Sequence, residues 1–156
     1  MEELYHHGIE GQKWGVRRFQ NEDGTLTPKG MKRYSRIVGS KDGLTVVERK
    51  GRNKGQFEFL DKDSKKVGQA MIDDEGSNNH IDWIGVGNKY RRKGYGQKAL
   101  DILIEDSRNQ GKKTITLEAA GLDDAAFHIY SKKGFKTLEA MDSDIWNGLI
   151  KMEKKL

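Results

Sequence analysis

The hydrophobic pattern of this chain changes its period once, and the change separates a strand-rich stretch from a helix. Four short runs are β-branched or alternate apolar and polar residues, with glycine, asparagine and aspartate between them: 44–49, 56–61, 66–73 and 79–86. Such runs are typical of strands. Residues 97–109 then place aliphatic side chains on one broad arc and charged side chains opposite, which predicts an amphipathic helix.

Strand and helix patterns continue to the C-terminus. Residues 113–118 predict a strand, 124–132 a second helix and 148–153 a last strand, so one or two strands follow the second helix. We therefore expect one α/β domain over residues 44–156. Residues 1–43 differ, because they hold seven glycines and the only proline, Pro28, but few clustered aliphatics. We expect them to form a docking or linker segment, since little in them could close a core alone.

Composition excludes several classes of protein. The 156 residues suffice for one compact domain with a short appendage. No cysteine is present, which excludes disulfides, thiolate metal sites and a cysteine nucleophile. No run approaches the ~18 apolar residues of a membrane span, and the N-terminus lacks the pattern of a secretory signal. These features predict a cytoplasmic protein with no membrane contact. The net charge of +5 permits phosphate or acidic partners, but no basic stripe interleaved with aromatics supports nucleic-acid binding.

A basic, glycine-rich segment joins the fourth strand to the first helix: Arg91-Arg92-Lys93-Gly94-Tyr95-Gly96-Gln97. The first amides of a helix have no acceptor within the chain, and the peptide dipoles place partial positive charge there. Glycines let the backbone approach a phosphate without a Cβ in the way. The segment therefore predicts an anion site. The alternative is a solvated basic turn before an ordinary helix.

A second motif supports the first: Asp123-Asp-Ala-Ala-Phe-His-Ile-Tyr130-Ser-Lys-Lys-Gly134-Phe135. In this order and spacing, the two motifs resemble the GCN5-related N-acetyltransferase (GNAT) family over about residues 44–156. The resemblance implies a mixed, mostly antiparallel sheet, two flanking helices, and a V between two parallel strands that holds acetyl-CoA. It implies no metal.

The resemblance also assigns roles to residues. Main-chain groups around Ile84 and Val86 would pair with the pantetheine arm of acetyl-CoA. The pyrophosphate would be bound by the loop, whose cofactor-binding residues would be Arg91, Arg92, Lys93, Gly94, Tyr95, Gly96 and Gln97. Tyr130 would protonate the departing thiolate, a role that suits a phenol because it stays protonated at neutral pH. The alternative for Tyr130 is a packed aromatic residue on an amphipathic helix.

Two departures from the family pattern bear on the site. Asp123 stands where the family often carries asparagine, so its expected cofactor contact could be replaced by capping of the second helix. Only Lys50–Gly55 separates the first two predicted strands, where family members usually insert two helices. Those helices normally wall the acceptor side. We therefore expect an open acceptor site.

The fourth predicted strand carries two candidates for the general base that deprotonates the acceptor amine. Strict alternation would place His80 and Asp82 on one face, and Asp73 and Glu118 end neighbouring strands. A carboxylate or histidine can take the proton of an acceptor amine through water. We choose Asp82. The second-helix residue His128 fits a surface or packing role better.

The N-terminal segment carries its own resemblance. Residues 5–30 are similar to a short module of phage and prophage virion-associated proteins. Trp14 and Phe19 beside Arg17 and Arg18 are of the kind enriched at protein interfaces. We expect docking to a virion or host protein, and a virion association of the chain. Adjacent His6 and His7 lack the further ligands that a metal site needs.

These observations together predict a phage-encoded N-acetyltransferase. The acceptor would be an amine of a host or phage protein, at a lysine or N-terminus, or a small amine, and the acetyl group would pass to it directly. The first alternative is a non-catalytic module of the same fold that binds coenzyme A or builds a virion. The second is a nucleic-acid binder that uses the basic loop.

Overall fold

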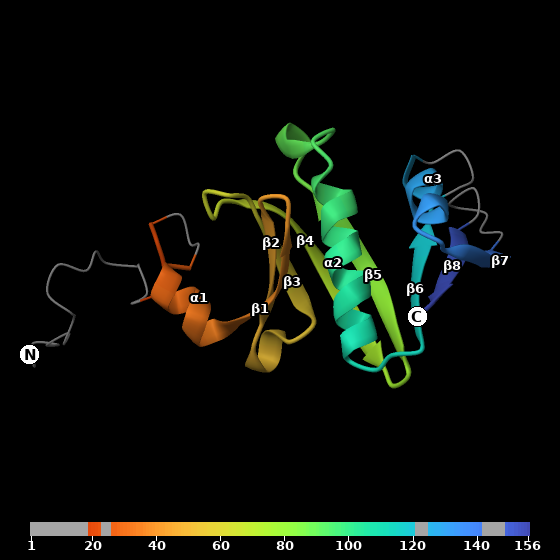
Figure 1. Ribbon diagram of the computed structural model, residues 1–156, viewed down its shortest axis with the longest axis horizontal. Coiled ribbons are helices and arrows are strands. Elements are labelled where there is room, and N and C mark those ends of the chain that lie inside the picture. Colours follow the sequence, from red (N-terminus) through yellow and green to blue (C-terminus); the bar gives the residue numbers. More distant parts are fainter. Residues whose placement is uncertain (1–18, 23–25, 121–124, 142–148) are drawn as a thin grey trace, which may run out of the picture.

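The computed structural model shows one eight-stranded sheet whose middle is crossed by a long helix (Figure 1). It describes residues 19–22, 26–120, 125–141 and 149–156. The strands are β1 (Ser35–Lys41), β2 (Leu44–Arg49), β3 (Gln56–Leu60), β4 (Lys66–Glu75), β5 (Asn78–Val86), β6 (Thr114–Ala119), β7 (Lys136–Met141) and β8 (Leu149–Lys155). The helices are α1 (Pro28–Tyr34), α2 (Tyr95–Asn109) and α3 (Ala125–Lys132), with short 3-10 turns η1 (Gly51–Asn53) and η2 (Asn88–Tyr90).

The sheet has the expected mixed, mostly antiparallel character. Its strand order is β1-β2-β3-β4-β5-β6-β8-β7, and only β5 and β6 run parallel. A parallel pair needs a crossover connection, and α2 supplies it. Between β2 and β3 the chain forms only the short turn η1, which confirms that the two helices usual at this point are missing.

The sheet begins earlier than the expected domain boundary between residues 43 and 44. Residues Ser35–Lys41 form β1, which pairs antiparallel with β2 across its whole length. Asp42 and Gly43 join the two strands, both with positive φ, as a two-residue hairpin turn requires. The boundary is therefore corrected, because β1 belongs to the sheet and α1 packs against it.

The start of α1 follows from its sequence. Thr27 caps the helix by accepting a hydrogen bond from the Gly30 amide at 3.1 Å, and Pro28 occupies the first turn. Phe19 packs edge-on against Tyr34. The described part of the N-terminal segment is thus held against the sheet through α1.

Helix α2 links the two halves of the core. Its Ala99, Ile102 and Leu103 pack with β2, β3 and β4, while Leu100 and Ile104 pack with β5, β6 and β8. Residues Phe127 and Tyr130 of α3 pack against the second of these clusters, so α2 and α3 cover the same face of the sheet. At the centre of the opposite face, Trp83 of β5 and Met71 of β4 are exposed.

Candidate active site

Strands β5 and β6 pair at one end and separate at the other. Their parallel register runs from Asn78 opposite Thr114 to Ile81 opposite Leu117 and stops there. Residues 83–86 continue to pair with β4 on their other edge. Figure 1 shows the two strands diverging toward the end where α2 begins. The β6-facing edge of β5 beyond Ile81 is therefore left without a strand partner.

A β-bulge lies where the two strands part. Ile72 of β4 pairs with Ile81 and Met71 pairs with Trp83, so Asp82 is an extra residue on β5. Ile84 and Val86 consequently turn toward α2 and pack against the core. Alternation holds from His80 through the buried Ile81 to Asp82, so His80 and Asp82 share the face opposite α2. The bulge breaks alternation only after Asp82 and places Trp83 on that face as well.

The loop after β5 ends at Gly94 and Gly96, which lie at the N-cap and in the first turn of α2. Gly94 occupies the N-cap position in the left-handed region, with φ 77°, and no side chain caps the helix. A Cβ added to Gly96 would meet only Val86, at 3.6 Å. The first amides of α2 thus lie next to the free edge of β5 and remain available to an anion.

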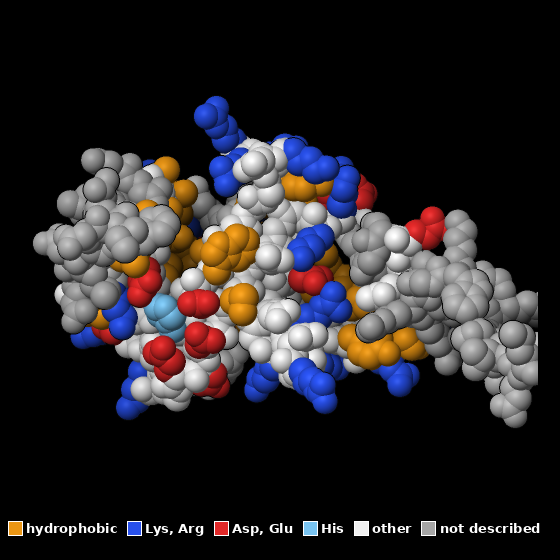
Figure 2. Space-filling model, turned by 180° about the vertical axis from the view of Figure 1, so that it is seen from behind, with side chains coloured by type: hydrophobic (Ala, Val, Ile, Leu, Met, Phe, Trp, Pro, Cys, Tyr) orange, Lys and Arg blue, Asp and Glu red, His pale blue; other side chains and the backbone are white. Residues whose placement is uncertain are grey.

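Cationic side chains surround this helix terminus. Lys89, Arg91, Arg92 and Lys93 are exposed, and no described carboxylate forms an ion pair with them. Lys89 lies over the Tyr90 ring at 5.3 Å, and Lys98 lies 5.9 Å from the Tyr95 ring centre. Figure 2 shows Lys and Arg side chains gathered at this end of the molecule. Their charge adds to that of the helix dipole.

Tyr130 lies on α3, on the far side of the splay from β5. Its ring is half-buried, 6.0 Å from that of Phe135, and borders the core cluster that Ile84 also borders. The structure thus brings Tyr130 and Ile84 against one cluster that includes Ile81 and Leu117, the last paired residues of the two strands. Tyr130 therefore also fits the alternative of a packed aromatic residue, because its ring packs against the core.

Asp82 is exposed on the bulge, and its carboxylate makes no hydrogen bond or ion pair with a described residue. His80 lies two residues earlier on β5, and its Nδ1 is 2.8 Å from the Thr116 hydroxyl on β6. Thr116 also accepts a hydrogen bond from Asn78 at 2.9 Å. His80 is therefore fixed in orientation, whereas Asp82 is not.

Asp123 lies outside the described residues, as do residues 1–18 with both of their histidines and Trp14. Among the residues that are described, no three His, Cys, Asp or Glu side chains form a group that could hold a metal ion. Nor does any helix of the described ranges have the length and apolarity to cross a membrane.

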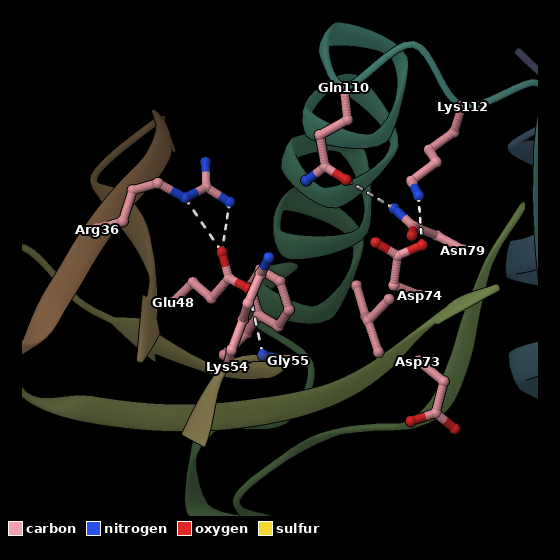
Figure 3. A pocket seen from close by; sticks show the side chains of 11 residues that line it. Arg36, Glu48, Lys54, Gly55, Asp73, Asp74, Asn79, Gln110 and Lys112 are labelled. Atoms are coloured by element: carbon pink, nitrogen blue, oxygen red, sulfur yellow. Dashed lines mark hydrogen bonds and ion pairs between the residues drawn. The ribbon is translucent and has the colours of Figure 1, made fainter. Parts of the chain in front are cut away.

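A cavity of about 610 Å³ lies near the other end of α2. Of the candidate bases named from the sequence, Asp73 borders it, and its side chain points away from the other labelled side chains (Figure 3). Figure 3 shows Arg36 directed at Glu48, which in turn accepts a hydrogen bond from the Gly55 amide at 3.2 Å. Arg36 also binds Asp106 of α2 at 2.9 Å. These bonds tie β1 and β2 to α2, so the charged groups of this cavity serve the fold.

One surface feature is not predicted from the sequence. Trp83 and Met71 are cross-strand partners and stay 49% and 44% exposed on the face opposite α2. The spacing Trp83–Gly85 was the available signal, because glycine in a strand often marks a close approach. Alternation alone assigns Trp83 to the core.

Comparison with known families gives one match. The model of a family described as the Acetyltransferase (GNAT) family matches residues 29–135, a range that includes β1. No curated protein matches this chain.

Solved structures share the fold at low sequence identity. The ribosomal-protein-S18-alanine N-acetyltransferase from Escherichia coli is 21% identical, with a TM-score of 0.59, over 68% of this chain and 71% of its own. A GNAT family acetyltransferase from Elizabethkingia anophelis, solved with acetyl-CoA bound, is 15% identical, with a TM-score of 0.61, over 74% of this chain and 100% of its own. Ard1 from Thermoplasma volcanium is 17% identical, with a TM-score of 0.60, over 84% of this chain and 94% of its own.

Proposed function

Because the chain belongs to the GNAT acetyltransferase family, whose acyl donor is acetyl-CoA, we propose that it passes the acetyl group directly to an acceptor amine within a ternary complex. The observation that carries the proposal is one juxtaposition. The unpartnered edge of β5 beyond Ile81 leads straight to the uncapped, glycine-bearing N-terminus of α2. An extended arm and a pyrophosphate are joined in the same way in coenzyme A.

The residues at this juxtaposition fit the donor. The main chain of residues 82–86 would pair with the pantetheine arm as an added strand does, with Ile84 and Val86 at its centre. The amides from Arg92 to Gln97 would bind the pyrophosphate. Lys93 and Arg91 would add charge, and Tyr95 would flank the helix start. Asp123, which lies outside the described residues, would contact the cofactor or cap the second helix.

Acetyl-CoA supplies an activated acetyl thioester, and the chain supplies orientation and proton transfer. Strand amides near Asp82 would polarise the acetyl carbonyl. The Tyr130 hydroxyl would donate its proton to the departing sulfur. Asp82, exposed and without a partner among the described residues, would accept the proton of the attacking amine through water.

The acceptor in this proposal is an amine of a host or phage protein or a small amine. The N-terminal segment, by its resemblance to the phage module, would dock the enzyme to a virion or host protein in the bacterial cytoplasm. We place the docking function in residues 1–18, since β1 and α1 belong to the folded part of the chain.

A non-catalytic module that binds coenzyme A is the second candidate. It is favoured by the short link η1, because the helices that normally wall the acceptor side are missing there. The two candidates share the cofactor site and differ in turnover.

Intact-mass measurement separates the two. The protein is incubated with acetyl-CoA and a panel of small amines, peptides and host protein extract. The proposal predicts that an acceptor gains the mass of one acetyl group, and that the gain requires acetyl-CoA. A protein that binds acetyl-CoA but acetylates no member of the panel is the non-catalytic module.

A further inference from the structure

The sheet face opposite α2 carries an exposed apolar pair at its centre. Trp83 of β5 and Met71 of β4 lie directly across from each other and remain 49% and 44% exposed. Figure 2 shows this face, with hydrophobic side chains at its middle and acidic side chains and a histidine beside them. We call Trp83, Met71, Asp73 and Asp82 the back-face patch.

The Trp83 ring lies over Gly85 of the same strand. A Cβ on Gly85 would lie 2.8 Å from Cζ2 of that ring, so the indole covers the glycine backbone. Any residue other than glycine at position 85 would lift the ring away. The indole therefore lies over the strand backbone, and an exposed aromatic residue is typical of the centre of a binding surface.

The charged residues of the patch are acidic, whereas the net charge of the chain is positive. Asp73 pairs with His80 in the strand register, beside Met71, and Asp82 precedes Trp83. Neither carboxylate forms an ion pair with a Lys or Arg of the described ranges. In a chain of net charge +5, two carboxylates without cation partners around an exposed indole select a cationic ligand.

The openness of the face favours a polypeptide over a small amine. Small ligands bind in concave pockets that bury most of their surface. Here η1 is the whole connection between β2 and β3, so no helix rises from that connection to enclose a small molecule against Trp83. A flat, apolar patch rimmed by carboxylates is instead matched by an extended segment with Lys or Arg side chains.

We infer that the back-face patch binds a basic polypeptide segment and thereby presents one of its amines to the point where β5 leaves β6. The ammonium or guanidinium groups would lie over Trp83 and beside Asp73. The inference rests on the proposed function, because the bound amine is the acceptor of the acetyl group. It narrows the acceptor to a protein with basic residues around the modified amine.

Binding is tested first, without turnover. Two peptides of equal length carry one central lysine, flanked by arginines in the first and by glutamates in the second. The indole N–H signal of Trp83 is assigned in a ¹H–¹⁵N spectrum with the Trp83→Phe variant. We expect the basic peptide to shift this signal and added salt to reverse the shift. Equal shifts with both peptides, or none with either, would overturn the inference.

Variants then test the patch in catalysis. Trp83→Ala should raise KM for the basic peptide about tenfold, because it removes the central contact. Asp73→Asn should raise it about threefold at low salt and less at high salt. The matched controls are Ile37→Ala, an exposed apolar residue on β1, and Asp63→Asn, an exposed carboxylate in the β3–β4 turn. Both controls should leave KM unchanged.

The outcomes separate this inference from the proposed function. Peptide binding at Trp83 without acetylation would support the patch and contradict the acetyltransferase activity. Acetylation of a small polyamine with no selectivity between the two peptides would support the activity and overturn the patch. An unchanged KM in both Trp83→Ala and Asp73→Asn would also overturn it.

Discussion

At the scale of residues, Tyr130 and Gly96 separate the chemistry of the proposed site from cofactor binding. Tyr130→Phe removes only a hydroxyl, and the ring can keep its packing against Phe135. We expect kcat to fall by about a hundredfold, as is typical of a lost general acid, while the affinity for acetyl-CoA stays nearly unchanged. Steady-state kinetics with calorimetric titration of acetyl-CoA measure both. Equal rates for the two proteins would assign the proton to water or another group.

Gly96→Val tests the phosphate site. The fold has room near this position, since an added Cβ meets only Val86 at 3.6 Å, so the free protein should stay folded. The valine would block the approach of a pyrophosphate to the α2 amides, and the rise in Tm caused by acetyl-CoA should disappear. Asn109→Val, which puts the same side chain at the other end of α2, is the control and should keep the rise. Unchanged acetyl-CoA affinity in Gly96→Val contradicts the phosphate site.

Some residues of the site could be predicted from the sequence and others could not. Gly94 and Gly96 could, because glycines before a helix have a local meaning. That Asp82 is an extra residue on β5 could not, because a bulge depends on how β4 and β5 register with each other. The exposure of Trp83 follows from the same bulge.

At the scale of elements, Asp101 connects three of them. Its carboxylate on α2 accepts hydrogen bonds from Lys41 of β1 at 2.7 Å and from Lys133, after α3, at 2.9 Å. Burial raises the pKa of Asp101, but the hydrogen bonds from Lys133 and Lys41 outweigh burial and leave the pKa below its usual value. A lowered pKa means that the folded state favours the ionised carboxylate.

The sign of the pH dependence follows. The stabilisation by Asp101 is present above the pKa of the unfolded chain and is lost as pH falls through the lower pKa of the folded state. Asp101→Asn should therefore lower the free energy of unfolding by about 1 kcal/mol at neutral pH, with little difference from the wild type in acid. Urea denaturation at several pH values measures this. A difference that stays constant or grows as pH falls would contradict the role.

Most of the helices and strands could be predicted from the sequence. The strands β2 to β5 and the helix α2 lie close to their expected ranges, because alternation and helical periodicity are local signals. Strand β1 was missed, since it is an edge strand with few apolar residues that is specified by pairing with β2. The Asp42–Gly43 turn was the signal that could have found it.

At the scale of the whole molecule, the folded part is predicted to work without the first residues. Removal of residues 1–18 keeps Phe19, which packs against Tyr34, and leaves β1 and α1 intact. We expect the truncated protein to bind acetyl-CoA and acetylate a small amine at the wild-type rate, and to lose association with a virion or host partner. Enzyme assays and co-purification measure the two properties. An altered choice of acceptor after truncation would mean that the segment walls the acceptor side.

The free edge of β5 and the N-terminus of α2 together form the proposed acetyl-CoA site. An amide ¹H–¹⁵N titration with acetyl-CoA tests this claim. We predict saturable shifts at the amides of residues 82–86, Gly94, Gly96 and Gln97, with those of β1 unaffected. Saturable binding whose shifts fall elsewhere, or no binding at all, would contradict the claim.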